Sequence, residues 1–98
     1  MDRASCLKTV ESIVCSDRNQ QYGDPENNFE LIANMWTSYL GVEIVPEDVA
    51  MMMIMLKIAR AKTGSYKDDN YIDIAGYAAC AAEIAANNEE LANDFRAG

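Results

Sequence analysis

The sequence contains no histidine, and this absence removes several kinds of catalytic site. A Cys–His nucleophile pair and a histidine-containing zinc site both need an imidazole, which this chain cannot supply. The three cysteines, Cys6, Cys15 and Cys80, are odd in number and lack the spacing of a metal site. We therefore expect reduced, buried thiols in a cytoplasmic protein, which would be the host cell's cytoplasm if a phage encodes the chain.

Long apolar runs and an excess of positive charge are also missing. The longest apolar run, Val49 to Leu56, has eight residues, whereas a membrane span needs about 20. No apolar segment follows Met1, so we expect neither a signal peptide nor contact with a membrane. With 8 basic and 16 acidic residues the net charge is −8, which argues against direct binding to nucleic acid.

The remaining pattern predicts an all-α fold, a compact bundle of about four helices that is oligomeric. Half of the 98 residues are apolar, which suits one domain with a small core that oligomerisation would help to stabilise. Pro25 and Pro46 are placed to start helices, and Gly41 and Gly64 to end them. The expected helices are approximately Asp2–Cys15, Pro25–Leu40, Pro46–Lys62 and Asp68 or Asp69 to Asn87.

In terms of organisation, we expect a single helical domain over residues 1–98. Its parts are an N-terminal helix (1–17), a polar turn (18–24), a three-helix core (25–87) and a C-terminal tail (88–98). The third helix is apolar on every side, so it is either central or part of a subunit interface, and its methionines pack in one or the other. Gly76 lies inside the fourth helix, where we expect another backbone or a ligand to approach closely.

Two basic residues, Lys57 and Arg60, lie three apart near the end of the third helix, so they share one face. An arginine can hold phosphate oxygens in bidentate fashion, and a lysine can act as a point charge beside them. The alternative is that both are solvated and favoured by the negative end of the helix dipole.

The start of the fourth helix carries carboxylates at helical spacing. Asp69 and Asp73 share a face that Tyr77 extends, and they are suited to bind Mg²⁺. Alternatively, Asp69 caps the helix and Asp73 pairs with a basic residue of the third helix. Glu83 either extends the same stripe or is solvated. In both cases we expect the basic and acidic groups to face each other, because a short loop joins the two helices.

A polar turn precedes the second helix. It carries Arg18 and Tyr22, and Asn28 follows in the first turn of that helix. A helix N-terminus attracts anions, and an aromatic ring can stack on a base. The alternative is a capping loop that only fixes the start of the helix.

Three motifs occur in order along the chain, YGDPENNF, VAMMMIMLKIAR and DNYIDIAGYAACAAE. Together they resemble a family of small phage and prophage proteins of unassigned function, over roughly Arg18 to Glu83. More distantly, the pattern is similar to the all-α nucleotide pyrophosphohydrolases of the MazG and dimeric dUTPase type. That similarity implies an oligomeric bundle that handles nucleotide phosphates, with Mg²⁺ held by an ExxE motif on one helix and an ExxD motif on the next.

The motif residues of the pyrophosphohydrolases are mostly replaced in this chain. Asp73 matches the final Asp of ExxD, but Asn70 stands where its Glu would be. The helix that would carry ExxE has methionines instead, with Lys57 and Arg60 at its end. These replacements favour binding over hydrolysis.

The first functional hypothesis is a phage nucleotide-binding protein, without cofactor or catalytic residue, that sequesters a nucleotide or cyclic-nucleotide immune signal. Its ligand-binding residues would be Arg18, Tyr22, Asn28, Lys57, Arg60, Asn70, Asp73 and Tyr77. The second is a Mg²⁺-dependent nucleotide pyrophosphohydrolase with Asp69, Asp73 and Glu83 as metal ligands. The third is an acidic protein that inhibits a nucleic-acid-binding defence enzyme of the host.

Overall fold

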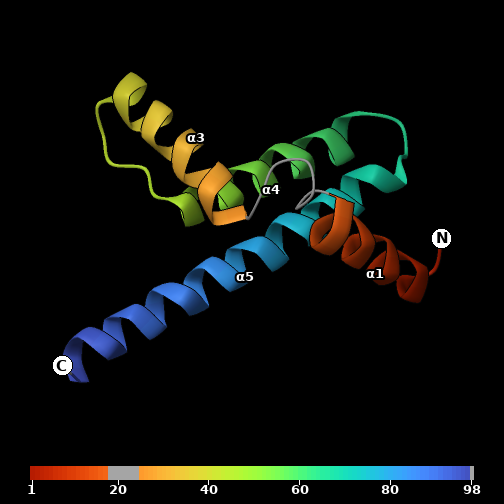
Figure 1. The fold of residues 1–98 in the computed structure, drawn as a ribbon. Helices are drawn as coiled ribbons and strands as arrows, with labels where there is room; N and C mark the ends of the chain where they lie inside the picture. The colour runs from red at the N-terminus through yellow and green to blue at the C-terminus, as the bar shows by residue number, and fades with distance from the viewer. Residues whose placement is uncertain (18–24, 98) are drawn as a thin grey trace.

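The chain is helical throughout the part that the structure describes. The structure, a computed structural model, describes residues 1–17 and 25–97, and the side chains of residues 1–15 and 28–94. These residues form four α-helices and no strand: α1 (Arg3–Ser12), α3 (Pro25–Leu40), α4 (Pro46–Thr63) and α5 (Asp68–Ala97) (Figure 1). A single π-helical turn, η1 (Ile13–Asp17), continues α1. The prediction of an all-α fold is confirmed.

The helix boundaries follow local signals in the sequence. α3 begins at Pro25 and ends at Leu40 as predicted, and Gly41 follows in a left-handed conformation with a φ of 74°. At the start of α4 the Asp48 carboxylate accepts a hydrogen bond of 3.1 Å from the Val45 N–H. Asp2 caps α1 by accepting from the Ser5 N–H at 2.8 Å, and this bond lowers the pKa of the Asp2 carboxyl.

The last helix is longer than the sequence predicts. We expected an end near Asn87 and a tail over 88–98, but α5 continues to Ala97. Asn87 and Asn88 are weak helix formers, yet no proline or glycine follows them before Gly98, and good helix formers such as Glu89 come next. Because the end of α5 extends past the other helices (Figure 1), the molecule measures 48 × 31 × 23 Å and is less compact than predicted. No described helix, even at this length, is apolar enough to span a membrane.

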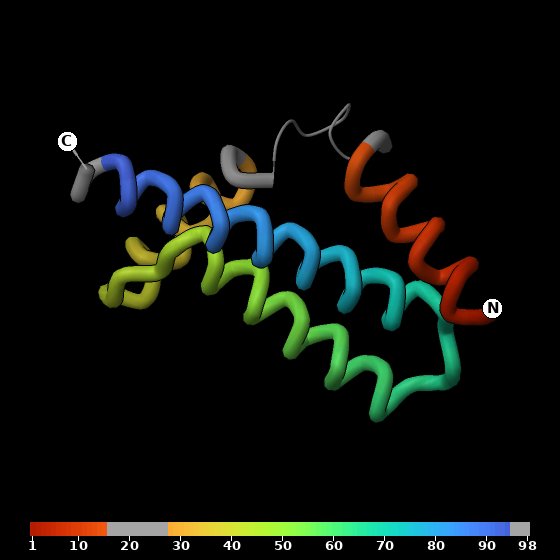
Figure 2. The backbone as a smooth tube through the Cα atoms, turned by 90° about the horizontal axis from the view of Figure 1, so that it is seen from below, coloured from red at the N-terminus to blue at the C-terminus, as the bar shows by residue number. Residues whose placement is uncertain are grey.

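The core lies where α3, α4 and α5 meet. α5 runs between α1 on one side and α4 on the other (Figure 2), so the central position belongs to α5. Of the two alternatives predicted for α4, a place in a subunit interface therefore stays a prediction. Residues buried in this core are Phe29, Ala33, Val49, Ala50, Cys80, Ala81 and Ile84.

Only one face of α4 contributes to this core. Val49 and Ala50 are completely buried, whereas Met51, Met52 and Met55 are 49%, 38% and 59% exposed. The prediction that these three methionines pack in the core is therefore wrong. The alternative, that they pack in a subunit interface, stays a prediction.

The cysteines differ in the same way. All three are free thiols, but only Cys80 is buried, whereas Cys6 is half-buried and Cys15 is exposed. The expectation of buried thiols is therefore confirmed for Cys80 alone.

α1 and η1 pack on α5 at Gly76. This glycine is buried, and a Cβ atom built on it would lie 3.1 Å from Cγ2 of Val14. A neighbouring element does approach closely at Gly76, but the group that meets it is the Val14 side chain of the π-helical turn and not the backbone or ligand that the sequence predicts.

Candidate functional site

An open pocket lies where the end of α4 meets the start of α5. Its volume is about 500 Å³, within the range of roughly 300–1,000 Å³ that is usual for small-molecule sites. The residues that line it are Lys57, Arg60, Thr63, Gly64, Ser65, Lys67, Asp69, Asn70 and Asp73. The structure therefore brings together five residues that the sequence singled out, two from α4 and three from α5.

An ion pair joins the two helices at this pocket. Nζ of Lys57 lies 3.0 Å from Oδ2 of Asp73, and the two side chains are 16% and 22% exposed. The predicted facing of basic and acidic groups is confirmed for this pair. The pair also neutralises one cation of the pocket.

The pocket has a positive balance of charge in an acidic chain. Within the described part of the chain neither Arg60 nor Lys67 forms an ion pair, and both are exposed, as is Asp69. The first turn of α5 adds the positive end of a helix dipole, whose first N–H groups have no partner inside the helix. The two free cations and this helix end together favour an anion.

The neutral residues of the pocket differ in what they can offer a ligand. Asn70 is 9% exposed and lines the pocket from α5, and no buried side-chain polar atom of the described residues lacks a partner. The Thr63 hydroxyl donates to the Ala59 carbonyl oxygen at 2.9 Å, and its oxygen can still accept a hydrogen bond. An amide and a hydroxyl on the wall of the pocket add hydrogen-bonding groups to its charges.

The loop between α4 and α5 is held from outside the pocket. The Tyr66 hydroxyl donates a hydrogen bond to Oδ1 of Asp68, and its ring lies 6.1 Å from that of Tyr71, centroid to centroid. The bond to Asp68, followed by the negative charge of that carboxylate, raises the pKa of the Tyr66 hydroxyl. This exposed contact joins the loop to the first turn of α5, beside the pocket residues Ser65 and Lys67 that flank Tyr66.

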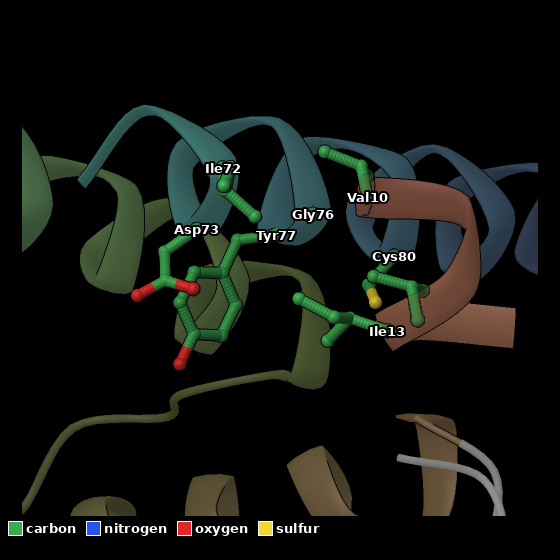
Figure 3. Close-up of a pocket in the computed structure, with 8 residues that line it drawn as sticks. Val10, Ile13, Ile72, Asp73, Gly76, Tyr77 and Cys80 are labelled. Carbon is green, nitrogen blue, oxygen red and sulfur yellow. The ribbon is translucent and has the colours of Figure 1, made fainter. Parts of the chain in front are cut away.

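Tyr77 is directed to a different place. It lines a cavity of about 20 Å³ between α1, η1 and α5, which is room for roughly one water molecule (Figure 3). Its ring lies 6.1 Å from that of Phe29 and packs against the core. Asp73 lines both cavities, and Tyr77 lines only this smaller one. Ligand binding by Tyr77 stays a prediction that this placement does not favour.

Two further predicted residues within the described part of the chain are not on the wall of the larger pocket. Asn28 is half-buried near the start of α3, and Glu83 is exposed on α5, about 15 Å along the helix from Asp73. Arg18 and Tyr22 lie outside the described residues.

The predicted metal ligands are not gathered into one site. Within the described residues no group of three Cys, Asp or Glu side chains could hold a metal ion, so Asp69, Asp73 and Glu83 do not form such a group. Of these three, only Asp69 and Asp73 line the pocket.

Four lining residues were not anticipated from the sequence. They are Thr63, Gly64, Ser65 and Lys67, at the end of α4 and in the loop. The signal that could have identified them was their position: a short connection between two helices with facing charged groups must border the space between those groups.

The chain is similar to two curated mycobacteriophage proteins. It is 53% identical over 75 residues to the Gene 55 protein of Mycobacterium phage L5, an alignment that covers 76% of this chain and 48% of that protein. It is 42% identical over 80 residues to the Gene 55 protein of Mycobacterium phage D29, covering 82% of this chain and 53% of that protein. The chain thus spans about half the length of the curated relatives it matches, and no solved structure matches it significantly.

These relatives confirm the predicted resemblance to phage proteins of unassigned function. A family model also matches most of the chain, over residues 5–85, and its description is a domain of unknown function. The chain therefore belongs to the DUF6378 family.

Proposed function

We propose that this protein binds a phosphate-bearing, nucleotide-like ligand in the pocket between α4 and α5 and does not cleave it. The observation that carries the proposal is the convergence of Lys57, Arg60 and Lys67 on one open pocket at the start of α5. In a chain of net charge −8, such a local excess of cations has an electrostatic use, because it attracts anions that the rest of the surface repels.

Each group has a distinct role in this proposal. The Arg60 guanidinium binds two phosphate oxygens in bidentate fashion, and the Lys67 ammonium acts as a mobile point charge. The N–H groups of the first turn of α5 complete the anion site. The Asn70 amide, on the same wall, bonds the base or the ribose.

The carboxylates support binding without cleavage. Phosphoryl chemistry with Mg²⁺ places metal ions against several carboxylates. Here Lys57 neutralises Asp73, and Asp69 is the other carboxylate that lines the pocket. The relatives from phages support a setting in the host cytoplasm, where the protein would sequester a nucleotide signal.

A thermal-shift panel tests this proposal. The purified chain is heated with nucleoside triphosphates, dinucleotides and cyclic nucleotides, with Mg²⁺ or with EDTA, and the nucleotides are analysed for products. A true ligand at 100 times its Kd stabilises the folded chain by about 2.7 kcal/mol. We expect a rise in melting temperature that persists in EDTA, with the nucleotide recovered intact.

Two variants with the same change of charge locate the site. Arg60→Ala should abolish the shift, whereas Lys8→Ala should retain it, because Lys8 is exposed on α1 and does not line the pocket. Turnover of a nucleotide would refute binding without cleavage. An equal loss of the shift in both variants would refute the assignment of the site.

We further propose that the protein is a homo-oligomer. The exposed methionines of α4 support this, since apolar surface of this kind is typical of subunit interfaces.

A further inference from the structure

The outward side of α4 is an apolar stripe with a charged residue at each end. Its apolar members include Met51, Met55 and Ile58, which are 49%, 59% and 45% exposed. α4 packs against α5 and α3, and in Figure 2 the other described helices lie above α4 or behind it, so its lower side in that view is uncovered. We define this α4 face as Asp48, Met51, Met52, Met55, Ile58, Ala59 and Lys62, which share one side of the helix at 3.6 residues per turn.

The chain alone exposes more surface than a compact monomer of its mass. Its accessible surface is 7062 Å², whereas a folded monomer of 10.9 kDa is expected to expose roughly 5,600 Å². The radius of gyration is 15.1 Å, against roughly 12.6 Å for a globular chain of this length. A standard interface buries about 800 Å² on each partner, which is less than this excess, although the end of α5 that extends past the other helices contributes to the excess (Figure 1).

The charges of the α4 face determine how two copies can meet on it. Asp48 and Lys62 lie seven residues before and seven residues after Met55, so they are two turns away on the same side, about 21 Å apart. Parallel packing of two such helices would oppose Asp48 to Asp48, which is unfavourable. Antiparallel packing opposes Asp48 to Lys62 twice, with the apolar residues between them.

We propose that a second copy of this chain covers the α4 face, with the two α4 helices antiparallel and a two-fold axis at Met55. Asp48 then faces Lys62 of the partner subunit, Met52 faces the partner subunit's Ile58, and Met55 faces its own counterpart. Lys62 forms no ion pair within the described chain, and one Asp48 oxygen is left over from the bond to Val45.

This arrangement leaves the ligand pocket open. Lys57 is half-buried against α5, and Arg60 lines the pocket rather than the α4 face. The inference rests on the proposed homo-oligomer but not on the proposed ligand, so the two are tested by separate measurements.

Sedimentation equilibrium tests whether the face is used at all. The unmodified chain should have twice the mass of 10.9 kDa. Met55→Glu places two carboxylates against each other at the axis and should weaken the dimer by at least about 100-fold. Arg60→Ala should leave the mass unchanged, even where it abolishes ligand binding.

Cross-linking tests the symmetry, and it does not depend on a destabilised variant. In a background with Cys6→Ser and Cys15→Ser, which leaves the buried thiol of Cys80, Met55→Cys should be joined to its own counterpart by a short bismaleimide. Lys8→Cys, on the exposed side of α1, is the matched control and should stay monomeric on a denaturing gel.

The outcomes separate the two levels of the proposal. A monomeric mass for the unmodified chain overturns both the oligomer and the α4 face. A dimer that Met55→Cys fails to cross-link overturns the face and leaves the oligomer standing. A dimer that is cross-linked at Met55 but dissociates with Met55→Glu supports the face, whatever the nucleotide panel shows.

Discussion

Lys57 on α4 and Asp73 on α5 connect the two helices that form the pocket, with Nζ of the lysine 3.0 Å from Oδ2 of the aspartate. The same contact affects both stability and charge, because it attaches α4 to the central helix and also neutralises a cation of the pocket. If the pocket binds a phosphate, Asp73 therefore weakens that binding, because it neutralises the charge of Lys57.

Asp73→Asn should tighten the binding of a phosphate-bearing ligand. The change keeps the size of the side chain and frees the charge of Lys57 for the ligand. A partly exposed pair of this kind is worth about 0.5–1 kcal/mol, which corresponds to a two- to fivefold lower Kd. Isothermal titration calorimetry of the variant with the best nucleotide of the panel gives this ratio.

The control for this prediction is a double-mutant cycle with Lys57→Met. Binding should weaken in Lys57→Met, and adding Asp73→Asn to it should change the Kd little, because no lysine is left to be freed. Weaker binding in Asp73→Asn alone would instead mean that the carboxylate itself bonds the ligand, in agreement with the prediction that Asp73 is a ligand-binding residue.

Gly76→Val should destabilise the fold by overfilling the contact between η1 and α5. The glycine is buried, and even a Cβ atom there would lie 3.1 Å from Cγ2 of Val14. Overpacking of this kind costs about 1–3 kcal/mol. Urea unfolding followed by circular dichroism measures the loss. The matched control is Ala79→Val on the exposed side of α5, which should change the free energy of unfolding by less than about 0.5 kcal/mol.

An unchanged stability in Gly76→Val would contradict the packing of α1 and η1 on α5. The loss of stability in Gly76→Val therefore tests how α1 and η1 pack on α5, which the sequence alone did not predict.

The sequence was sufficient where local chemistry decides the structure. Pro25 starts α3 because its φ is already fixed at a helical value, and Gly41 ends it because glycine readily adopts the left-handed conformation. Lys57 and Asp73 were expected to face each other because a short loop joins their helices, and they do.

The sequence was insufficient where the choice depends on which neighbour covers a helix. Tyr39 is a large aromatic residue near the end of α3, yet it is 89% exposed, which its residue type alone does not predict. Tyr77 is on the same helix as Asp73 and was expected to bind the same ligand, but its ring packs against Phe29 in the core. The length of α5 was missed because two asparagines weaken a helix without ending it.

Gly41→Ala should destabilise the turn between α3 and α4 through the backbone alone. Gly41 has a φ of 74°, and a Cβ atom there would meet nothing within 4 Å. A left-handed alanine costs about 1 kcal/mol, which lowers the melting temperature of a domain this size by roughly 4–8 °C. Differential scanning calorimetry should find a smaller loss for Gly41→Asn, because asparagine tolerates this conformation better. Equal losses in the two variants would contradict a purely conformational cause.

Asp68→Asn should lower the pKa of Tyr66 and weaken the contact between the loop beside the pocket and the start of α5. In the folded chain the bond to Asp68 raises the pKa of the Tyr66 hydroxyl above its ordinary value of about 10. The stabilisation from this bond is therefore complete below pH 10 and is lost as the pH rises through the raised pKa. Ultraviolet absorbance of the ionised phenolates, titrated from pH 8 to 13, should show one tyrosine moving to lower pH in the variant.

Asp69→Asn is the matched control, because it removes the same charge from the neighbouring residue, which lines the pocket instead of bonding Tyr66. It should leave the tyrosine titration almost unchanged. If both variants shift the titration equally, the raised pKa of Tyr66 comes from the general negative charge at the start of α5 and not from the hydrogen bond to Asp68. If only Asp68→Asn shifts it, a parallel loss of nucleotide affinity would link the loop to the anion site, because Lys67 follows Tyr66 directly in the chain.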